Sequence, residues 1–473
     1  MLKTLRIQNF KGWKDTGEIK FAPITLFFGA NSSGKSSIGQ FLMMLKQTVE
    51  SSDRKSIFFL GNTNSHVQLG LYNDIVYQHD WKNNISFSYS WKLGDLFLFK
   101  TKQGKEQKTI ECDKIKFEAT SEIDGNSNVP RVKQLQYHLY LRESEMFDVS
   151  MESCDKVGYT LSSKSYNIKR SEGRAWKLPS TIRFYGFPDE TNIYYKNVYF
   201  LPLLNYEHEN FFRHFYYLGP LRSKPGRIYS WPGNEPDGVG DTGENTVSAI
   251  LAARDRKINL GYRKPYKAFD IVIADALKKL GLIEDFSVKN IAEGQQRREY
   301  EVRIRTKGSE DDVLLPDVGF GVSQVLPVLV ACYYAPQDSI IVMEQPEIHL
   351  HPNAQAALAD VMIDVINSGE NGKNRNIQLI IETHSEHFLR RLQRRIAEDQ
   401  ETEKDKQLKN RISGYFVDTT KHPVVLKELE IDLFGNITNW PKDFFGDEIG
   451  DISGQIKASM EKRKRLQDLG GTK

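Results

Sequence analysis

The stretch Ile24–Ser37, which reads ITLFFGANSSGKSS, decides the fold. It begins with an unbroken apolar run from Ile24 to Phe28, which predicts a buried parallel strand. The letters GANSSGKS then fit the pattern G-x-x-x-x-G-K-[ST], and the following SIGQFLMMLKQ has the apolar spacing of a helix. A strand, a glycine-rich loop and a helix in this order are the context of a phosphate-binding loop. The sequence therefore predicts that a nucleotide binds here.

The chemistry of such a loop comes from its backbone and from two side chains. Glycines let successive N–H groups point into one concavity, and the start of the helix adds positive partial charge. We expect Lys35 to reach the β- and γ-phosphates of ATP and the Ser36 hydroxyl to ligate Mg²⁺. The predicted nucleotide-binding residues are Gly29, Ala30, Asn31, Ser32, Ser33, Gly34, Lys35, Ser36 and Ser37.

Length and composition restrict the class of protein. A chain of 473 residues is too long for one ordinary core, so two or three subdomains are expected. A net charge of +3 gives no global field that would favour nucleic acid or a membrane surface. The three cysteines are isolated, as expected of reduced thiols in a cytosolic protein. No apolar run is long enough to span a bilayer, so we predict a cytoplasmic protein without a membrane partner.

Three later segments carry groups suited to phosphate chemistry. The buried strand SIIVM ends at Glu344, whose carboxylate is expected to hold Mg²⁺ beside Ser36. A second buried strand, QLIIET, leads to His384, which is expected to contact the γ-phosphate. The segment DVGFGVSQ, Asp317–Gln324, is a second helix start able to hold phosphate, far downstream of the first. Two such helix starts for one nucleotide suggest that the second serves a neighbouring subunit.

This order of motifs resembles the soluble ATP-binding-cassette ATPases of the structural-maintenance, Rad-type repair and OLD lineage. The residues that carry the resemblance read NFKGW, ITLFFGANSSGKSS, YLGPLR, VGFGVSQVLP, EQPEIHLHP, ETHSE and NWPKDFF. The resemblance implies an α/β fold, a P-loop ATPase head with a mixed sheet flanked by helices, and ATP with Mg²⁺ as cofactors. It also implies a head-to-tail homodimer or higher homo-oligomer with ATP between two heads. His384 matches the switch histidine, and the signature that completes the partner's site matches Gly319, Gly321, Ser323 and Gln324.

One departure from that family concerns catalysis. Cassette ATPases carry Asp-Glu at the end of the second strand, whereas this chain has Glu344 and Gln345. A glutamine cannot accept the proton of the attacking water, so hydrolysis is expected to be slow or partner-gated unless Glu347 or Glu344 substitutes. A metal site built from Glu347, His349 and His351 is the less favoured alternative for this loop, since further ligands are lacking nearby. The Q-loop is not placed; its candidates are Gln68, Asp74 and Gln78.

The expected organisation has five parts. They are an N-terminal part of the head (1–82), a β-rich insertion of many short strands (83–205), a connecting lobe (206–310), a C-terminal part of the head (311–455) and a basic tail (456–473).

Two basic clusters could contact nucleic acid. The first, in the insertion, surrounds Tyr166 and Trp176 and consists of Lys164, Lys169, Arg170, Arg174 and Lys177. The second lies on a predicted helix and consists of Arg390, Arg391, Arg394 and Arg395. We favour a solvated surface over a nucleic-acid track for both. The aromatic residues between Phe211 and Tyr217 are interpreted as core.

Several functions fit this pattern. ATPases with similar motifs are the sensor or regulatory subunits of bacterial anti-phage systems such as Septu and PARIS, in which the nuclease is a separate subunit. The resemblance therefore favours a defence ATPase with a separate nuclease, because no nuclease motif follows His384. The alternatives are a DNA repair or recombination ATPase, the ATPase of a transporter, and a structural nucleotide binder with very slow hydrolysis.

Overall fold

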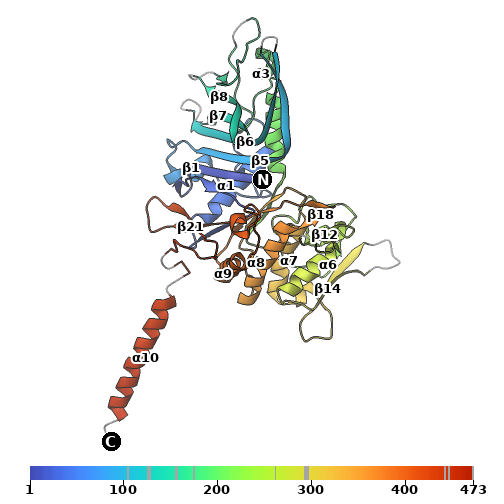
Figure 1. Cartoon of the computed structure of the whole chain (residues 1–473), viewed down its shortest axis with the longest axis vertical. Helices are drawn as coiled ribbons and strands as arrows, with labels where there is room; N and C mark the ends of the chain where they lie inside the picture. The colour runs from blue at the N-terminus through green and yellow to red at the C-terminus, as the bar shows by residue number, and fades with distance from the viewer. Residues whose placement is uncertain are drawn as a thin grey trace.

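The structure is a computed structural model of the 473-residue chain. It describes residues 1–103, 106–124, 129–154, 158–173, 176–261, 263–291, 298–441, 444–445 and 448–470. Figure 1 shows a β-rich upper lobe, an α/β lower lobe and a single helix that projects away from both.

A six-stranded sheet forms the centre of the lower lobe. Its order is β10 (Phe215–Leu218), β17 (Ile340–Glu344), β20 (Gln378–Glu382), β4 (Ile24–Gly29), β21 (Ile412–Asp418) and β22 (Val425–Glu428). The first five strands are parallel and β22 is antiparallel to β21. The carboxyl ends of these parallel strands therefore meet at one edge of the sheet.

Both faces of this sheet are buried, which explains the unbroken apolar run of β4. Ile24, Leu26 and Phe28 pack into a core formed with α7 (Phe320–Tyr334), α8 (Pro352–Asn367) and α9 (Glu386–Glu398). Phe27 points to the other core, which contains the apolar side of α1 (Lys35–Glu50). The helix predicted after the loop and the basic helix predicted around Arg390–Arg395 are thus confirmed.

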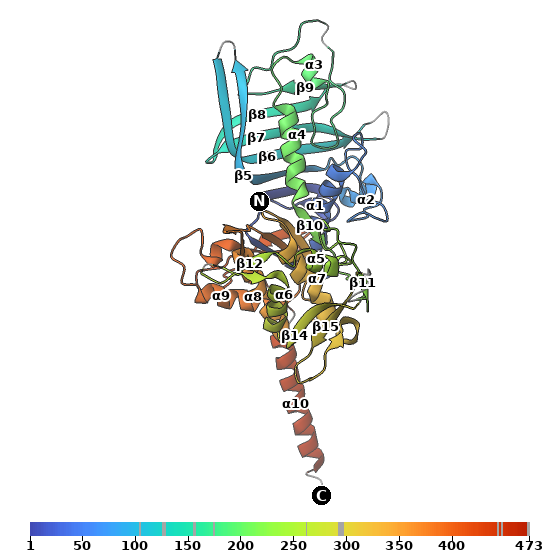
Figure 2. The same ribbon diagram turned by 90° about the vertical axis from the view of Figure 1, so that its right-hand side faces the viewer.

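An antiparallel sheet of eight strands builds the upper lobe. Its order is β2 (Trp13–Asp15), β1 (Leu2–Phe10), β5 (Ser86–Gln103), β6 (Glu106–Ile123), β7 (Pro130–Leu141), β8 (Ser144–Ser153) and β9 (Tyr159–Ser162), with β3 (Ile19–Lys20) also paired to β1. Because β5 pairs with β1, the strands predicted as an insertion continue a sheet that the N-terminus begins. Figure 2 shows α4 (Leu201–Arg213) lying across one face of this sheet.

The prediction that this region is rich in strands is confirmed, but the prediction that the strands are short is wrong for β5 and β6. The stretches ISFSYSW and LFLFKTK are not separate strands, because β5 runs through both for 18 residues. Its pairing with β6 shifts register between Lys92 and Phe97, so the ladder continues past Gly94. A local irregularity of this kind bends a strand without ending it.

Smaller elements complete the lower lobe. Two short helices are α5 (Thr246–Ala252) and α6 (Phe269–Lys279). One small sheet contains β11 (Tyr229–Ser230), β14 (Asp285–Asn290), β15 (Glu299–Arg305) and β16 (Val313–Leu314). Another contains β12 (Lys257–Asn259), β13 (Lys267–Ala268), β18 (Gly369–Glu370) and β19 (Lys373–Asn374).

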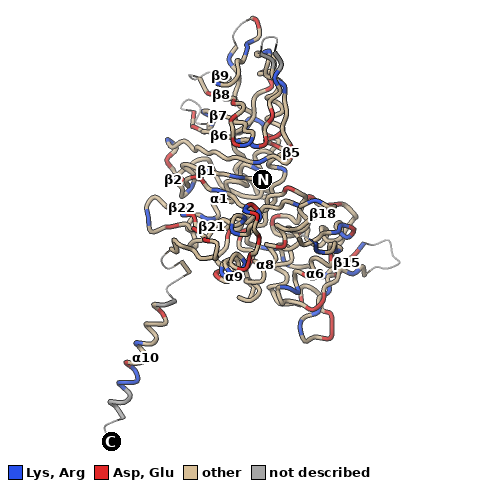
Figure 3. Tube along the Cα trace, in the orientation of Figure 1, with Lys and Arg blue, Asp and Glu red and all other residues tan. Residues whose placement is uncertain are grey.

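The projecting helix is α10 (Glu448–Gly470), and its second half is the segment predicted as a basic tail. The side chains described between positions 451 and 465 are all exposed. Figure 3 shows that blue basic positions lie mainly on the outer half of the helix. In the part of the chain that the structure describes, no helix is long and apolar enough to cross a membrane.

Candidate nucleotide-binding site

The predicted phosphate-binding loop connects β4 to α1 at the carboxyl edge of the parallel sheet. Gly29 and Gly34 have φ angles of 146° and 101°, a region that favours glycine. A Cβ atom at Gly29 would also lie 3.0 Å from Ser33 Oγ and 3.1 Å from Val417 Cβ. Two of the pattern's fixed positions therefore require glycine for backbone geometry, before any ligand is considered.

Lys35 is the first residue of α1, and its side chain folds back over the loop. Its Nζ donates hydrogen bonds to the carbonyl oxygens of Gly29 at 2.9 Å and Ala30 at 2.7 Å. Burial lowers the pKa of Lys35, and the nearby carboxylate of Glu382 partly opposes this shift. The ammonium group is thus held inside the loop, where phosphate oxygens could replace the two carbonyls as its partners.

The carboxylate that contacts the loop is Glu382, which the sequence analysis did not single out. β20 lies between β4 and β17, so Glu382 is in register with Phe27 on one side and Glu344 on the other. Ser36 Oγ donates to Glu382 Oε1 at 3.0 Å, and Lys35 Nζ lies 3.9 Å from the same oxygen. Burial and the neighbouring Glu344 raise the pKa of Glu382 to about 7. The available signal was that QLIIE, like IIVME, is an apolar strand ending in a carboxylate.

Glu344, the predicted Mg²⁺ carboxylate, lies at the same edge but has other partners. The hydroxyl of Tyr217 donates to Glu344 Oε1 at 2.7 Å, and Arg222 Nη2 donates to the Glu344 carbonyl at 3.2 Å. Burial raises the pKa of Glu344, against the hydrogen bond from Tyr217 and the charge of Arg222. The aromatic run interpreted as core does bury Phe211 and Phe215, but Tyr217 at its end also reaches this site.

Gln345 and Glu347 occupy the turn after β17. Gln345 has a φ of 45°, and its N–H donates to the Glu382 carbonyl at 2.8 Å. Glu347 is buried, and its Oε1 accepts from Thr383 Oγ1 at 2.7 Å and from the N–H of His384 at 2.8 Å. Among the described residues its second oxygen, Oε2, has no hydrogen-bond partner. These two hydrogen bonds from Glu347 fix the position of the backbone at His384.

The predicted histidines have distinct surroundings. His384 is half-buried, and its pKa is lowered by burial and by the charge of Lys35. His351 caps α8, because its Nδ1 accepts from the N–H of Asn353 at 3.4 Å. The ring of His349 packs edge-on against Phe320 at 5.4 Å. His349 and His351 therefore have structural contacts of their own, and the structure brings neither to the loop.

The predicted signature segment forms the start of α7. Gly319 is exposed and has open space where a Cβ would lie, whereas a Cβ at Gly321 would lie 3.2 Å from the His349 carbonyl oxygen. Ser323 and Gln324 are buried, and Ser323 Oγ donates to the Phe320 carbonyl at 2.8 Å. Between described residues, no hydrogen bond or ion pair joins positions 317–324 to positions 29–37.

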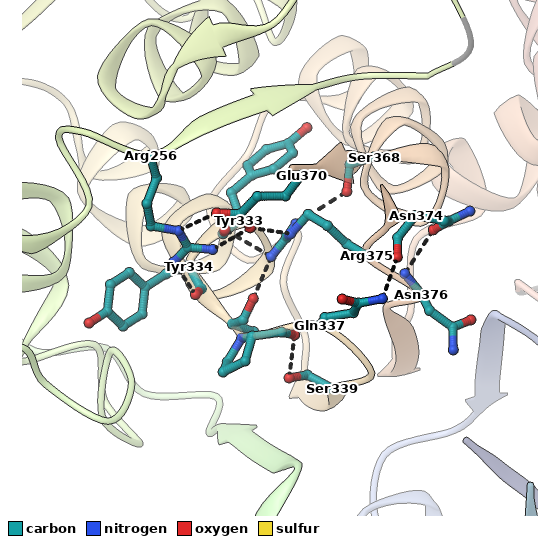
Figure 4. A network of polar contacts seen from close by, with 12 residues as sticks. Arg256, Tyr333, Tyr334, Gln337, Ser339, Ser368, Glu370, Asn374, Arg375 and Asn376 are labelled. Carbon is teal, nitrogen blue, oxygen red and sulfur yellow. Dashed lines mark hydrogen bonds and ion pairs between the residues drawn. The ribbon is translucent and has the colours of Figure 1, made fainter. Parts of the chain in front are cut away.

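The far end of α7 is fixed by a buried polar network (Figure 4). Arg375 is fully buried and donates to the carbonyls of Tyr333 and Ala335, while Arg256 pairs with Glu370. Burial lowers the pKa of Arg375 to about 10. Since these carbonyls are among the last of the helix, Arg375 satisfies acceptors that have no partner within it. The network connects the end of α7 to the segment that leads into β20.

The basic cluster of α9 is largely engaged within the chain. Arg391 and Arg395 both pair with the buried Asp360 on α8, at 2.6 and 2.7 Å. The other two arginines of α9, Arg390 and Arg394, pair with Glu386 and Glu398. This agrees with the preferred interpretation of a structural, solvated helix face.

In the upper-lobe cluster the two aromatic residues differ. Tyr166 is buried, whereas Trp176 is exposed. Arg174 lies outside the described residues, as do Lys442 and Asp443 of NWPKDFF. The Q-loop candidates Gln68, Asp74 and Gln78 are all exposed and stay predictions.

A family model decides where this chain belongs. The model of the AAA ATPase domain (AAA_15) matches residues 1–214 and 253–389, which include the loop and the ends of β17 and β20. The chain belongs to the AAA ATPase domain family. Beyond this AAA ATPase domain, residues 409–454 match a family described as a protein of unknown function (DUF3696). That segment contains β21, β22 and the NWP motif. The comparison with curated proteins finds no match.

Solved structures similar to this AAA ATPase include heads of structural-maintenance proteins. One is the crystal structure of the SmcHead bound to the C-winged helix domain of ScpA, with 12% identity, coverage of 91% of this chain and 98% of that chain, and a TM-score of 0.39. Another is the SMC head domain from Thermotoga maritima, with 11% identity, coverage of 91% and 99%, and a TM-score of 0.38.

Proposed function

We propose that the chain binds ATP with Mg²⁺ at residues 29–37 and hydrolyses it. The observation that carries this proposal is the meeting of Lys35, Ser36 and Glu382 at the carboxyl edge of the sheet. A lysine, a hydroxyl and a carboxylate around a glycine-rich turn are the groups that phosphates and their metal ion require. The nucleotide is bound mainly by backbone N–H groups of the loop and by the ammonium group of Lys35.

The donor set fits Mg²⁺. Ser36 Oγ, Glu382 and Glu344 are all oxygen donors, as this hard cation prefers, and Glu382 Oε2 is buried without a partner among the described residues. When bound, the ion would neutralise phosphate charge and align the phosphates with the attacking water. We propose that Ser36 ligates the ion directly and that Glu344 holds it through a water molecule, as the resemblance implies. We propose that Lys35 contributes charge and orientation and that His384 contacts the γ-phosphate.

The proposed hydrolysis is slow or gated by a partner. Gln345 can orient a water molecule by hydrogen bonding but cannot take its proton. Glu344 and Glu347 are the carboxylates next to it in sequence, and Glu347 retains one oxygen without a partner among the described residues. We propose that one of these two carboxylates accepts the proton, and that the rate of hydrolysis depends on completion of the site by the partner.

The proposed assembly is a head-to-tail homodimer or higher homo-oligomer. Gly319 at the start of α7 is exposed, and Phe320 is 63% exposed, so this end of the helix is open to a second copy. In such a dimer Gly319, Gly321, Ser323 and Gln324 complete the neighbour's site. We further propose that the ATPase is the sensor or regulatory subunit of a bacterial anti-phage complex with a separate nuclease, which rests on the family resemblance of the motifs.

The nucleotide proposal is tested with Lys35→Ala. We expect ATP affinity to fall by at least about tenfold and turnover to be lost, because the substitution removes a charge directed at phosphate. Thermal stability is expected to change little, because the desolvation cost of burying the Lys35 ammonium offsets the loss of its hydrogen bonds to the Gly29 and Ala30 carbonyls. Lys20→Ala, which removes an exposed lysine of β3, is the matched control. An affinity retained within a few-fold would refute the loop assignment.

The defence proposal has a separate test. A bacterial host carrying the gene with its native neighbours is challenged with phages, with either the wild-type or the Lys35→Ala protein. We expect protection from the wild type only, together with co-purification of a nuclease. Equal phage sensitivity, or a neighbourhood of repair or permease genes, would contradict the defence role without affecting the ATPase assignment.

A further inference from the structure

The contact between Ser36 and Glu382 was not expected from the motifs, which pair the loop with the carboxylate of β17. The strand order explains it. β20 is inserted between β4 and β17, so the strand end beside the loop belongs to Glu382, and Glu344 lies one strand further away. The hydroxyl of Ser36 meets Glu382 Oε1 at 3.0 Å.

The second oxygen of Glu382 is the more informative atom. Oε2 is buried, and no donor among the described residues hydrogen-bonds to it. Only 11% of the Glu382 side chain is exposed, and Glu344 adds a like charge on the next strand. Burying a carboxylate oxygen without a partner is unfavourable, and a glutamine would satisfy Ser36 without the charge. Structural needs alone therefore do not account for a glutamate here.

Glu344 is less free to act as the sole carboxylate ligand. Its Oε1 is occupied by the Tyr217 hydroxyl at 2.7 Å, and its backbone carbonyl accepts from the buried Arg222. Glu382, by contrast, has one oxygen on Ser36 and the other without a partner among the described residues. A divalent cation at Ser36 would satisfy this oxygen and reduce the repulsion between the two carboxylates.

We propose that Glu382 is a ligand of the divalent cation that accompanies the nucleotide, acting beside Ser36, with Glu344 as the outer carboxylate held by Tyr217. The proposal deepens the proposed function and rests on it, because the cation arrives with the nucleotide. No bond is made or broken in this step. Two oxygen ligands, Ser36 Oγ and a Glu382 oxygen, exchange their mutual hydrogen bond for contacts to one cation.

The test uses Mn²⁺ as the probe and a non-hydrolysable ATP analogue, so that activity is not the readout. Free Mn²⁺ is followed by electron paramagnetic resonance while it is titrated into the full chain with the analogue present. Glu382→Gln is nearly isosteric and keeps an oxygen for Ser36. We expect it to weaken Mn²⁺ binding by at least about tenfold. Binding of a fluorescent ATP analogue in EDTA is expected to stay within about twofold of wild type, since the loop is intact.

The controls separate the two proposals. Glu386→Gln removes a carboxylate at the start of α9, close in sequence but paired with Arg390, and should titrate like wild type. Ser36→Ala and Glu382→Gln should be non-additive in Mn²⁺ affinity, because both ligate one ion. If Glu382→Gln is poorly folded, Glu382→Asp replaces it and is expected to weaken Mn²⁺ binding to an intermediate degree.

Two results would overturn the inference. Unchanged Mn²⁺ affinity in Glu382→Gln, with Glu344→Gln strongly weakened, would restore Glu344 as the ligand and leave the ATPase proposal standing. Wild-type Mn²⁺ affinity in Glu382→Asp would likewise overturn the inference and leave the ATPase proposal standing. Failure of the wild-type chain to bind the analogue at all would refute the proposed function itself.

Discussion

His66 links the end of the phosphate-loop helix to a distant loop, and this link makes stability depend on pH. Its Nδ1 lies 2.8 Å from both carboxylate oxygens of Asp241, and its Nε2 lies 3.5 Å from Glu50 at the end of α1. Burial and the charge of Lys46 lower the pKa of His66. The hydrogen bonds to Asp241 and Glu50 outweigh both and raise it from 6.5 to about 9. The imidazolium is therefore favoured in the folded state.

Folding raises the pKa of His66, and this direction determines how stability depends on pH. A group whose pKa is raised by folding stabilises the protein fully below its unfolded pKa of 6.5, and this contribution is lost as pH rises through 9. A rise of the pKa from 6.5 to about 9 corresponds to about 3 kcal/mol of stabilisation of the folded state. Because 24% of the His66 side chain and 44% of that of Glu50 are exposed, screening by solvent reduces the expected contribution to about 1–3 kcal/mol.

The perturbation is His66→Gln, which stays neutral at every pH. We expect the variant to be less stable than wild type by about 1–3 kcal/mol at pH 6 and nearly equal to it at pH 9.5. Urea denaturation followed by tryptophan fluorescence, with thermal midpoints at both pH values, measures the difference. His387→Gln, which changes an exposed histidine of α9, is the control and should differ little from wild type at both pH values. A loss for His66→Gln that is equal at pH 6 and pH 9.5 would refute the ion-pair explanation.

Two further predictions concern catalysis. Gln345→Glu should raise the rate of ATP hydrolysis by supplying a proton acceptor. Glu344→Gln should nearly eliminate hydrolysis by weakening the metal centre. Unchanged rates in steady-state assays of both variants would show that neither side chain acts in hydrolysis. Gly319→Arg should leave ATP binding by the isolated subunit intact but abolish turnover and ATP-dependent association, because Gly319 is exposed with open space at its Cβ position and the long side chain enters the neighbour's site. Mixing it with Lys35→Ala should restore part of the activity, since one site of each mixed dimer is whole, and normal turnover by Gly319→Arg alone would show that the site is self-contained.

Predictions that depend on neighbouring residues were successful, whereas predictions that depend on the pairing of distant strands were not. The phosphate-binding loop and α1 were predictable because neighbouring residues determine them: an apolar run, two glycines with positive φ and a helical stripe. The division of the upper lobe into short strands was wrong because Gly94 and the lysines around it look like turn signals. Pairing with β6 across a register shift, which no local pattern reveals, keeps β5 continuous.

The sequence by itself determined a glycine-rich loop between a buried strand and a helix, and two further buried strands, one of which ends at Glu344. Only the tertiary structure decided which carboxylate meets the loop. The order of strands in a sheet depends on how distant segments pack, and placing β20 beside β4 brings Glu382, rather than Glu344, to Ser36. The sequence also did not predict the contacts of Tyr217 and Arg222 with Glu344, or the pairing of His66 with Asp241. Contacts between residues this far apart in the chain exist only once the sheet and its covering helices are assembled.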